Sequence, residues 1–141
     1  MIAPPSAAGS YVLDSQGLYL AAMNSDRQRA IASGAADLER LVLVSSITLA
    51  EVLHGSRTDA RVHRYLKGVK RIPVDDSIAK KAGALLGSAP DRGKTKSRTV
   101  DAIVCATAIL HAPRPVVIVS SDPDDLRALL GHEPGIAVNR V

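Results

Sequence analysis

The chain has 141 residues, which is enough for one domain with a full hydrophobic core and too few for two such domains. Its 46% of hydrophobic residues include no stretch near the roughly eighteen consecutive apolar residues of a membrane-spanning helix, and its first residues lack the pattern of a secretory signal. We therefore expect a cytoplasmic protein with no membrane partner. The net charge of +4 permits a polyanionic partner without requiring one.

Strand-like and helix-like segments alternate along the chain. This alternation predicts an α/β fold of three layers, in which a mainly parallel sheet of about five short strands is flanked by helices. Residues 1–9 are rich in proline and alanine, so we expect a disordered leader there and a single domain over residues 10–141. The expected strands are 10–13, 41–44, 70–74, 115–120 and 136–140, and the expected helices are 15–23, 25–39, 46–55, 58–67, 76–87, 99–111 and 123–130, with a loop at 89–98.

Four carboxylates stand in or directly after apolar segments, where an unpaired charge is costly. Asp14 and Asp122 follow apolar runs at the expected ends of parallel strands, and this edge is where open α/β sheets bind ligands. Glu51 and Asp101 lie in helical segments so apolar that we expect both side chains to be buried. Four such acids, without a comparable set of buried bases, indicate a shared site for a divalent metal ion.

Each acid except Glu51 also has a purely structural explanation. Asp122 precedes Pro123 and is suited to cap the next helix, as Ser45 or Ser46 and Thr99 are suited to cap theirs. Asp101 would favour its helix dipole from the first turn, and Asp14 is compatible with an ordinary turn. The joint pattern favours a site, because separate structural explanations would otherwise have to coincide.

The four acids lie in the segments Leu13–Ser15, Leu49–Gly55, Val100–Ala108 and Val119–Leu126. In their order along the chain, these segments resemble the acidic motifs of the PIN-domain family, particularly its VapC-type toxins. The resemblance runs from about residue 11 to 141. It implies a parallel sheet flanked by helices and a magnesium- or manganese-dependent endoribonuclease centre. It also implies a cognate antitoxin whose tail occludes that centre, and a homodimer.

Carried over residue by residue, the resemblance gives Asp14, Asp101 and Asp122 as ligands of one or two Mg²⁺ or Mn²⁺ ions, with Glu51 completing the catalytic acidic pocket. Hard oxygen ligands suit these ions, which lower the pKa of a bound water so that it can attack phosphorus. Three further residues are expected to orient a ligand or a bridging water, with turn and cap roles as the alternative: Ser15, Ser121 and Asp125.

Basic residues gather in two places. Four of them alternate through the loop that leads to Asp101, where we expect contacts with RNA phosphates, and simple exposure is the alternative. A second group would line one face of the helix over 58–67, for which a solvated face is the simpler explanation. The chain has no Trp or Phe, which argues against base recognition on an aromatic platform. The loop residues are Arg92, Lys94, Lys96 and Arg98, and the helix residues are Arg57, Arg61 and Arg64, with Lys67 beside them.

Three functions fit these observations: a metal-dependent endoribonuclease of a VapBC-type pair, a catalytically silent PIN-fold RNA-binding or scaffolding protein, and an unrelated α/β hydrolase acting on a small phosphate ester. The presence of all four acids favours the first. No pair of histidines has zinc-ligand spacing, and neither a G-x-S-x-G nor a G-x-x-x-x-G-K-[ST] motif occurs. The single cysteine, Cys105, is expected to be an inert core thiol.

Two predicted helices carry more apolar side chains than one face of a sheet is expected to cover. A groove for an antitoxin helix is one interpretation, and core packing is the other. The side chains come from helices 15–23 and 46–55: Leu18, Tyr19, Ala22, Met23, Ile47, Leu49 and Val52.

Overall fold

The structure is a computed structural model that describes residues 9–23, 40–90 and 97–141. The predicted helix over 25–39 and residues 1–8 of the predicted leader lie outside the described residues. Gly9, which we expected in the leader, is buried, and its carbonyl accepts a hydrogen bond from Leu41 N at 3.3 Å. The ordered domain therefore begins no later than Gly9.

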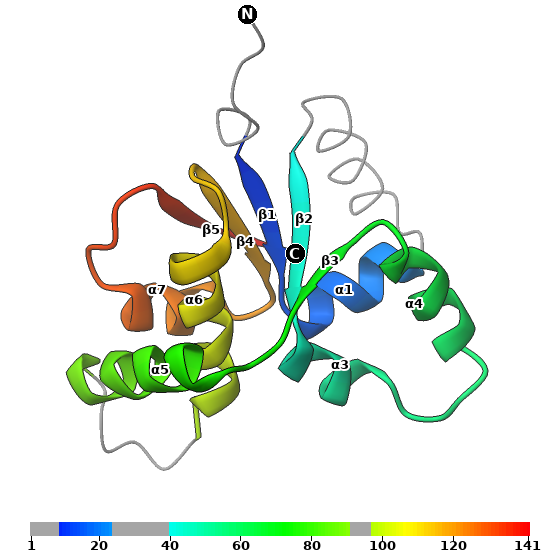
Figure 1. Ribbon diagram of the computed structural model, residues 1–141, viewed down its shortest axis with the longest axis horizontal. Helices are drawn as coiled ribbons and strands as arrows, with labels where there is room; N and C mark the ends of the chain where they lie inside the picture. Colours follow the sequence, from blue (N-terminus) through cyan, green and yellow to red (C-terminus); the bar gives the residue numbers. More distant parts are fainter. Residues whose placement is uncertain (1–8, 24–39, 91–96) are drawn as a thin grey trace, which may run out of the picture.

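The described residues confirm the predicted alternation of strands and helices (Figure 1). None of the described helices is long and apolar enough to cross a membrane. The strands are β1 (Ser10–Leu13), β2 (Leu41–Ser45), β3 (Lys70–Ile72), β4 (Val116–Ser120) and β5 (Ile136–Arg140), and the helices are α1 (Ser15–Ala22), α3 (Ser46–Val52), α4 (Asp59–Leu66), α5 (Asp76–Ser88), α6 (Thr99–His111) and α7 (Pro123–Leu130).

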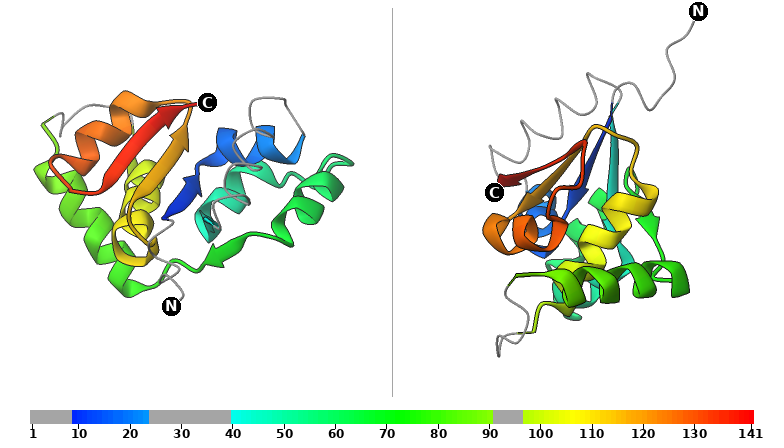
Figure 2. Two further views of the ribbon diagram at one scale, coloured as in Figure 1. Left: turned by 90° about the horizontal axis from the view of Figure 1, so that it is seen from above. Right: turned by 90° about the vertical axis from the view of Figure 1, so that its left-hand side faces the viewer.

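The sheet is five-stranded and wholly parallel, in the order β3-β2-β1-β4-β5. Successive strand residues point to opposite faces, so each strand contributes to two cores. Val12 packs in one core with residues of α5, α6 and α7, whereas Leu13 packs in the other with residues of α1, α3 and α4. Figure 2 shows these two groups of helices separated by the sheet. The three-layer α/β fold is confirmed.

The segment after α3 differs from the prediction, because the helix ends at Val52 and not near residue 55. Leu53 is extended, and Gly55 has a φ of +76°, which favours glycine. The Asp59 carboxylate accepts hydrogen bonds from the backbone N–H groups of Gly55, at 2.8 Å, and His54, at 3.3 Å. These bonds satisfy the turn in place of further helical bonds, so His54 lies beyond the helix.

The strand order reverses direction at β1, which pairs with β2 on one side and with β4 on the other. The carboxyl ends of β1 and β4 therefore lie side by side at a topological switch point, the usual ligand-binding position in open α/β sheets. In Figure 1, α1 and α3 begin at this lower edge of the sheet, where α6 also has its first turn. The fold thus brings four separate parts of the chain to one edge.

Candidate active site

Asp14 is the most enclosed of the four predicted acids, with 7% of its surface exposed at the end of β1. It is the N-cap of α1, and its Oδ1 accepts a hydrogen bond from Gly17 N at 2.8 Å. Its Oδ2 accepts a second bond, at 3.2 Å, from Ser121 N in the segment after β4. Asp14 therefore has a structural role, because one carboxylate ties the start of α1 to the end of β4.

Gly17 allows this close approach between α1 and β4. A Cβ atom at this position would lie 3.0 Å from the Val119 carbonyl oxygen and 3.4 Å from Asp14 Oδ1. The same Val119 oxygen accepts the backbone N–H of Asp14 at 3.1 Å. A side chain at Gly17 would therefore press on the atoms that hold Asp14 in place.

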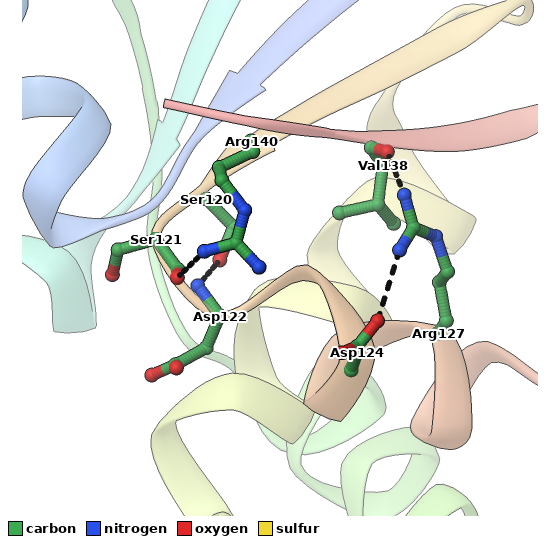
Figure 3. Close-up of polar contacts among 7 residues, drawn as sticks. All are labelled: Ser120, Ser121, Asp122, Asp124, Arg127, Val138 and Arg140. Atoms are coloured by element: carbon green, nitrogen blue, oxygen red, sulfur yellow. Dashed lines mark hydrogen bonds and ion pairs between the residues drawn. The ribbon is translucent and has the colours of Figure 1, made fainter.

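Hydrogen bonds fix the segment that carries Asp122. Val141 N donates to the Ser120 carbonyl at 2.9 Å, and Arg140 Nη1 donates to the Ser121 carbonyl at 3.1 Å. Asp122 N donates to Ser120 Oγ at 2.9 Å (Figure 3). The end of β5 and the Ser120 hydroxyl therefore hold the backbone on which the Asp122 carboxylate stands.

The Asp122 side chain does not cap α7. Asp122 occupies the N-cap position and Pro123 the first helical position, as predicted, but the Asp122 carboxylate makes no capping hydrogen bond and is exposed. In Figure 3 it points away from the Arg140 guanidinium. The capping explanation for this carboxylate is therefore wrong, and its oxygens remain available to a ligand.

Asp101 lies in the first turn of α6 and is partly buried. Burial is the largest cause that raises the pKa of its carboxyl to about 6, and the negative charges of Asp122, Asp125, Asp14 and Glu51 contribute to the same shift, in that order. A first-turn acid that interacted only with the helix dipole would have a lowered pKa, because the helix N-terminus favours the charged carboxylate. The structure thus brings the four predicted acids, together with Asp125, within electrostatic reach of one position.

Glu51 is exposed, which corrects the expectation that its helix would bury it. The buried positions of α3 are Thr48 and Val52, which lie four residues apart on one face, and Glu51 lies beside that face and is exposed. Although its sequence is mostly apolar, α3 therefore has one buried face and one exposed face. Glu51 instead borders a shallow open hollow, here called the acidic hollow, whose described lining is Ser15, Gln16, Tyr19, Glu51, Val52 and His54.

Three polar groups near this edge were not predicted as site residues. The Thr48 hydroxyl, three residues before Glu51, is fully buried and makes no hydrogen bond within the described residues. Ser120 and Arg140 hold the Asp122 segment, as described above. Nothing local in the sequence indicates Arg140, because its role depends on the parallel pairing that sets it opposite Ser120.

The other predicted residues fall in different environments. Ser15 borders the acidic hollow, Ser121 contacts Asp14 through its backbone, and Asp125 lies in the first turn of α7. Arg98, which we expected in an exposed loop, is 7% exposed and occupies the N-cap position of α6, where we had expected Thr99. Its burial limits direct contact with RNA. The remaining loop cations, Arg92, Lys94 and Lys96, lie outside the described residues.

Two further expectations concern apolar surroundings. Cys105 is fully buried, and burial, with a smaller contribution from the Asp101 charge, raises the pKa of its thiol far above its ordinary value. The predicted burial of this thiol in the core is confirmed, and its inertness stays a prediction. Core packing also explains most of the apolar side chains assigned to an antitoxin groove, because among them only Tyr19 is exposed, at 42%.

The acids at this edge have the chemistry of a divalent-cation site. Carboxylate oxygens are suitable ligands for Mg²⁺ or Mn²⁺, and the mutual repulsion at Asp101 is the kind that a cation relieves. Within the described ranges, however, no three His, Cys, Asp or Glu side chains are arranged to hold a metal ion as they stand. The chemistry of the acids fits the ion, and binding would require the ligand carboxylates to come closer together than they stand.

Comparison with solved structures identifies the fold. The chain is similar to a chain of VapBC2 from Rickettsia felis bound to a promoter DNA fragment, with a TM-score of 0.71, 16% identity, and coverage of 93% of this chain and 98% of the other. A DNA-bound VapBC from Salmonella typhimurium gives a TM-score of 0.66, 19% identity and coverage of 93% and 97%. A toxin-antitoxin complex from Klebsiella pneumoniae gives a TM-score of 0.64 and 21% identity, with coverage of 91% of this chain and 96% of the other.

These likenesses confirm the predicted PIN-like fold of the VapC type. No known protein family matches the chain by sequence profile, and no curated protein matches its sequence. Because the identities lie between 16% and 21%, the likeness establishes the fold, and the activity must be argued from the residues of the site.

Proposed function

We propose that the chain is a metal-dependent endoribonuclease and the toxin of a VapBC-type toxin-antitoxin pair. The observation that carries this proposal is the gathering of Asp14, Glu51, Asp122 and Asp125 around Asp101 at the switch point of the sheet, where burial and then these negative charges raise the pKa of Asp101. Perturbed carboxyl groups at such an edge are typical of a reaction centre. The fold shared with toxin-antitoxin chains supports the biological class.

In this proposal Asp14, Asp101 and Asp122 would hold one or two Mg²⁺ or Mn²⁺ ions. The bound cation would supply a water of lowered pKa and charge neutralisation at the phosphate. Asp14 also keeps the segments after β1 and β4 together through its bonds to Gly17 N and Ser121 N. Glu51, which lines the acidic hollow, would orient a water or a sugar hydroxyl in this proposal.

The proposed partners follow from the same assignment. They are an RNA substrate, a cognate antitoxin and a second copy of the chain in a homodimer, all in the cytoplasm. The antitoxin would occlude the acidic edge, by which we mean the edge of the sheet that carries Asp14, Asp101 and Asp122. The similar structures are toxin-antitoxin complexes, which supports the antitoxin. Sedimentation of the purified chain, alone and with its antitoxin, would determine both assemblies.

One observation favours the alternative of a catalytically silent RNA-binding protein. Among the described residues, no three potential ligands are close enough to hold a metal ion as they stand. A silent protein would bind RNA without cleaving it in any metal. The two functions therefore differ in a direct measurement.

Purified chain should cleave total RNA in manganese and lose that activity in chelator, and sequencing of the new ends would map the cleavage sites. Asp101→Asn protein should leave the RNA intact, which excludes a contaminating nuclease. RNA that stays whole in both magnesium and manganese would contradict the proposed enzyme. Turnover of a small phosphate ester without RNA cleavage would instead indicate a phosphatase.

A second prediction concerns Arg140, a positioning residue for Asp122. Arg140→Ala removes the bond to the Ser121 carbonyl, so the Asp122 carboxylate should be less well placed. Loss of a residue that orients a metal ligand typically weakens metal affinity by roughly 10–100-fold, and we expect an effect of this size for Arg140→Ala. Calorimetric titration with manganese would measure the effect, and cleavage should recover at high manganese.

Arg127→Ala is the matched control for Arg140→Ala. Arg127 also donates to a backbone carbonyl of β5, that of Val138 at 2.8 Å, and pairs with Asp124, but it does not hold the Asp122 segment (Figure 3). Its loss should lower stability without changing manganese affinity. Equal weakening of manganese binding in both variants would mean that Arg140 acts only through general stability.

A further inference from the structure

Positive charge is concentrated in one short part of the chain. Residues 57–71 contain six Lys and Arg residues and one Asp, a net charge of +5, whereas the whole chain carries +4. The rest of the chain is therefore slightly acidic. A nuclease with an acidic centre needs cations elsewhere to attract its polyanionic substrate. The segment that contains α4 therefore accounts for the whole net positive charge of the chain.

The cations of α4 lie together on its outer face. The helix buries Val62 and Leu66, four residues apart, against the core. Arg61, Arg64 and Lys67 repeat at spacings of three on the opposite side, and all are exposed. We call Arg57, Arg61, Arg64 and Lys67 the basic face. The two ion pairs found among the described residues involve other arginines, so the basic face is not neutralised by them.

The basic face borders a second hollow, whose described lining is Ala22, Arg61, Arg64 and Tyr65. Ala22 is at the end of α1, on the same helix face as Ser15 and Tyr19, because residues three and four apart are neighbours. Ser15 and Tyr19 border the acidic hollow. One face of α1, about 12 Å long for eight residues, therefore leads from the acidic edge to the basic face.

The chemistry of this path favours nucleic acid over a protein helix. Protein interfaces have an apolar centre, whereas nucleic-acid interfaces are polar and positively charged. Among the described residues that line the two hollows, Ala22 and Val52 are buried in the core, and the exposed ones are Gln16, Tyr19, Glu51, His54, Arg61 and Arg64. We propose that Arg61 and Arg64 bind the sugar-phosphate backbone of an RNA strand that runs along α1 to the acidic edge.

This inference rests on the proposed ribonuclease function, but it can be tested apart from cleavage. In chelator, binding of a fluorescein-labelled single-stranded RNA would be followed by anisotropy over a series of KCl concentrations. Arg61→Gln with Arg64→Gln should lower the slope of log affinity against log salt by about 0.7 per lost phosphate contact, or about 1.4 in total. At about 0.1 M salt this corresponds to roughly fivefold weaker binding per contact.

Lys80→Gln with Lys81→Gln is the matched control, because it removes the same charge from α5, on the other side of the sheet. This control should bind RNA with an unchanged slope. Arg61, Arg64 and Lys80 are exposed and Lys81 is half-buried, so the melting temperatures of both double variants should remain near that of the native chain. Equal losses of RNA binding in the two variants would reduce the effect to net charge and overturn the proposal.

Two other outcomes are equally decisive. Unchanged RNA binding by the Arg61 and Arg64 variant, together with lost binding of a labelled polyglutamate peptide, would make the basic face a site for an acidic protein and overturn the proposal. Arginine-dependent RNA binding without any cleavage in manganese would support the binding surface and contradict the proposed enzyme. The two proposals can thus fail separately.

Discussion

Asp14→Asn is expected to reduce RNA cleavage by at least about a hundredfold, while the fold is retained. Loss of residues that only orient a metal ligand already costs about 10–100-fold, and loss of a ligand should cost more. Asparagine is nearly isosteric and is itself a good N-cap, so its side-chain oxygen can still accept the hydrogen bond from Gly17 N. Initial cleavage rates in manganese and a thermal melt in chelator would measure the two effects.

Alanine at the same position provides a second comparison. Asp14→Ala removes both hydrogen bonds of the carboxylate and should destabilise the protein by about 1 kcal/mol through the lost cap. Asp75→Ala is the matched control, because Asp75 caps α5 through a 3.0 Å bond to Ile78 N. Asp75→Ala should be destabilised and fully active. A folded Asp14→Asn protein with substantial manganese-dependent cleavage would remove Asp14 from the reaction centre.

Much of the fold could be predicted from local patterns. Short apolar runs alternate with helical segments, and buried parallel strands covered on both faces produce such runs. Asp14 and Asp122 could be placed at one edge because parallel strands present their carboxyl ends together. Asp101 followed from its position in the first turn of an apolar helix. In these cases chain order and periodicity were sufficient.

Other features depend on contacts that no local pattern contains. Glu51 was expected to be buried because its neighbours are apolar, yet α3 buries only Thr48 and Val52 and turns Glu51 outward. Arg98 was expected in an exposed loop, but the packing around the start of α6 buries it. Arg140 reaches Ser121 only because β5 lies beside β4. Tertiary packing decides such side-chain environments.

The structural role of Asp14 also exceeded the alternatives drawn from sequence. The sequence offers a turn residue and a metal ligand as competing explanations of Asp14, but its carboxylate caps α1 and also contributes to the negative charge at Asp101. One carboxylate can satisfy two backbone donors with one lone pair on each oxygen and retain others for a cation. Structural and functional roles therefore coexist at this position.

Asp101→Asn is expected to make the metal-free protein more stable at pH 7. The pKa of this carboxyl is about 6 in the folded chain, against an ordinary value of 3.8. Between about pH 4 and pH 6 the folded state therefore binds more protons than the unfolded state, and stability falls as the pH rises. Asparagine removes this loss, which should be about 1–2 kcal/mol once partial exposure to solvent is considered.

Bound manganese should make the native chain more stable than the Asp101→Asn variant, the reverse of the order expected without metal. At a hundredfold excess over its dissociation constant, manganese should stabilise the native chain by about 2.7 kcal/mol, and the variant should lose most of that gain. Asp76→Asn, which changes an exposed first-turn acid of α5, controls for the helix dipole and should leave the metal response intact. Thermal melts of the three proteins in chelator and in manganese, from pH 4 to pH 8, would separate the explanations. If Asp101 served only the dipole, Asp101→Asn would lower metal-free stability by on the order of 0.3–1 kcal/mol and keep the full manganese shift, because no repulsion would be relieved and no ligand removed.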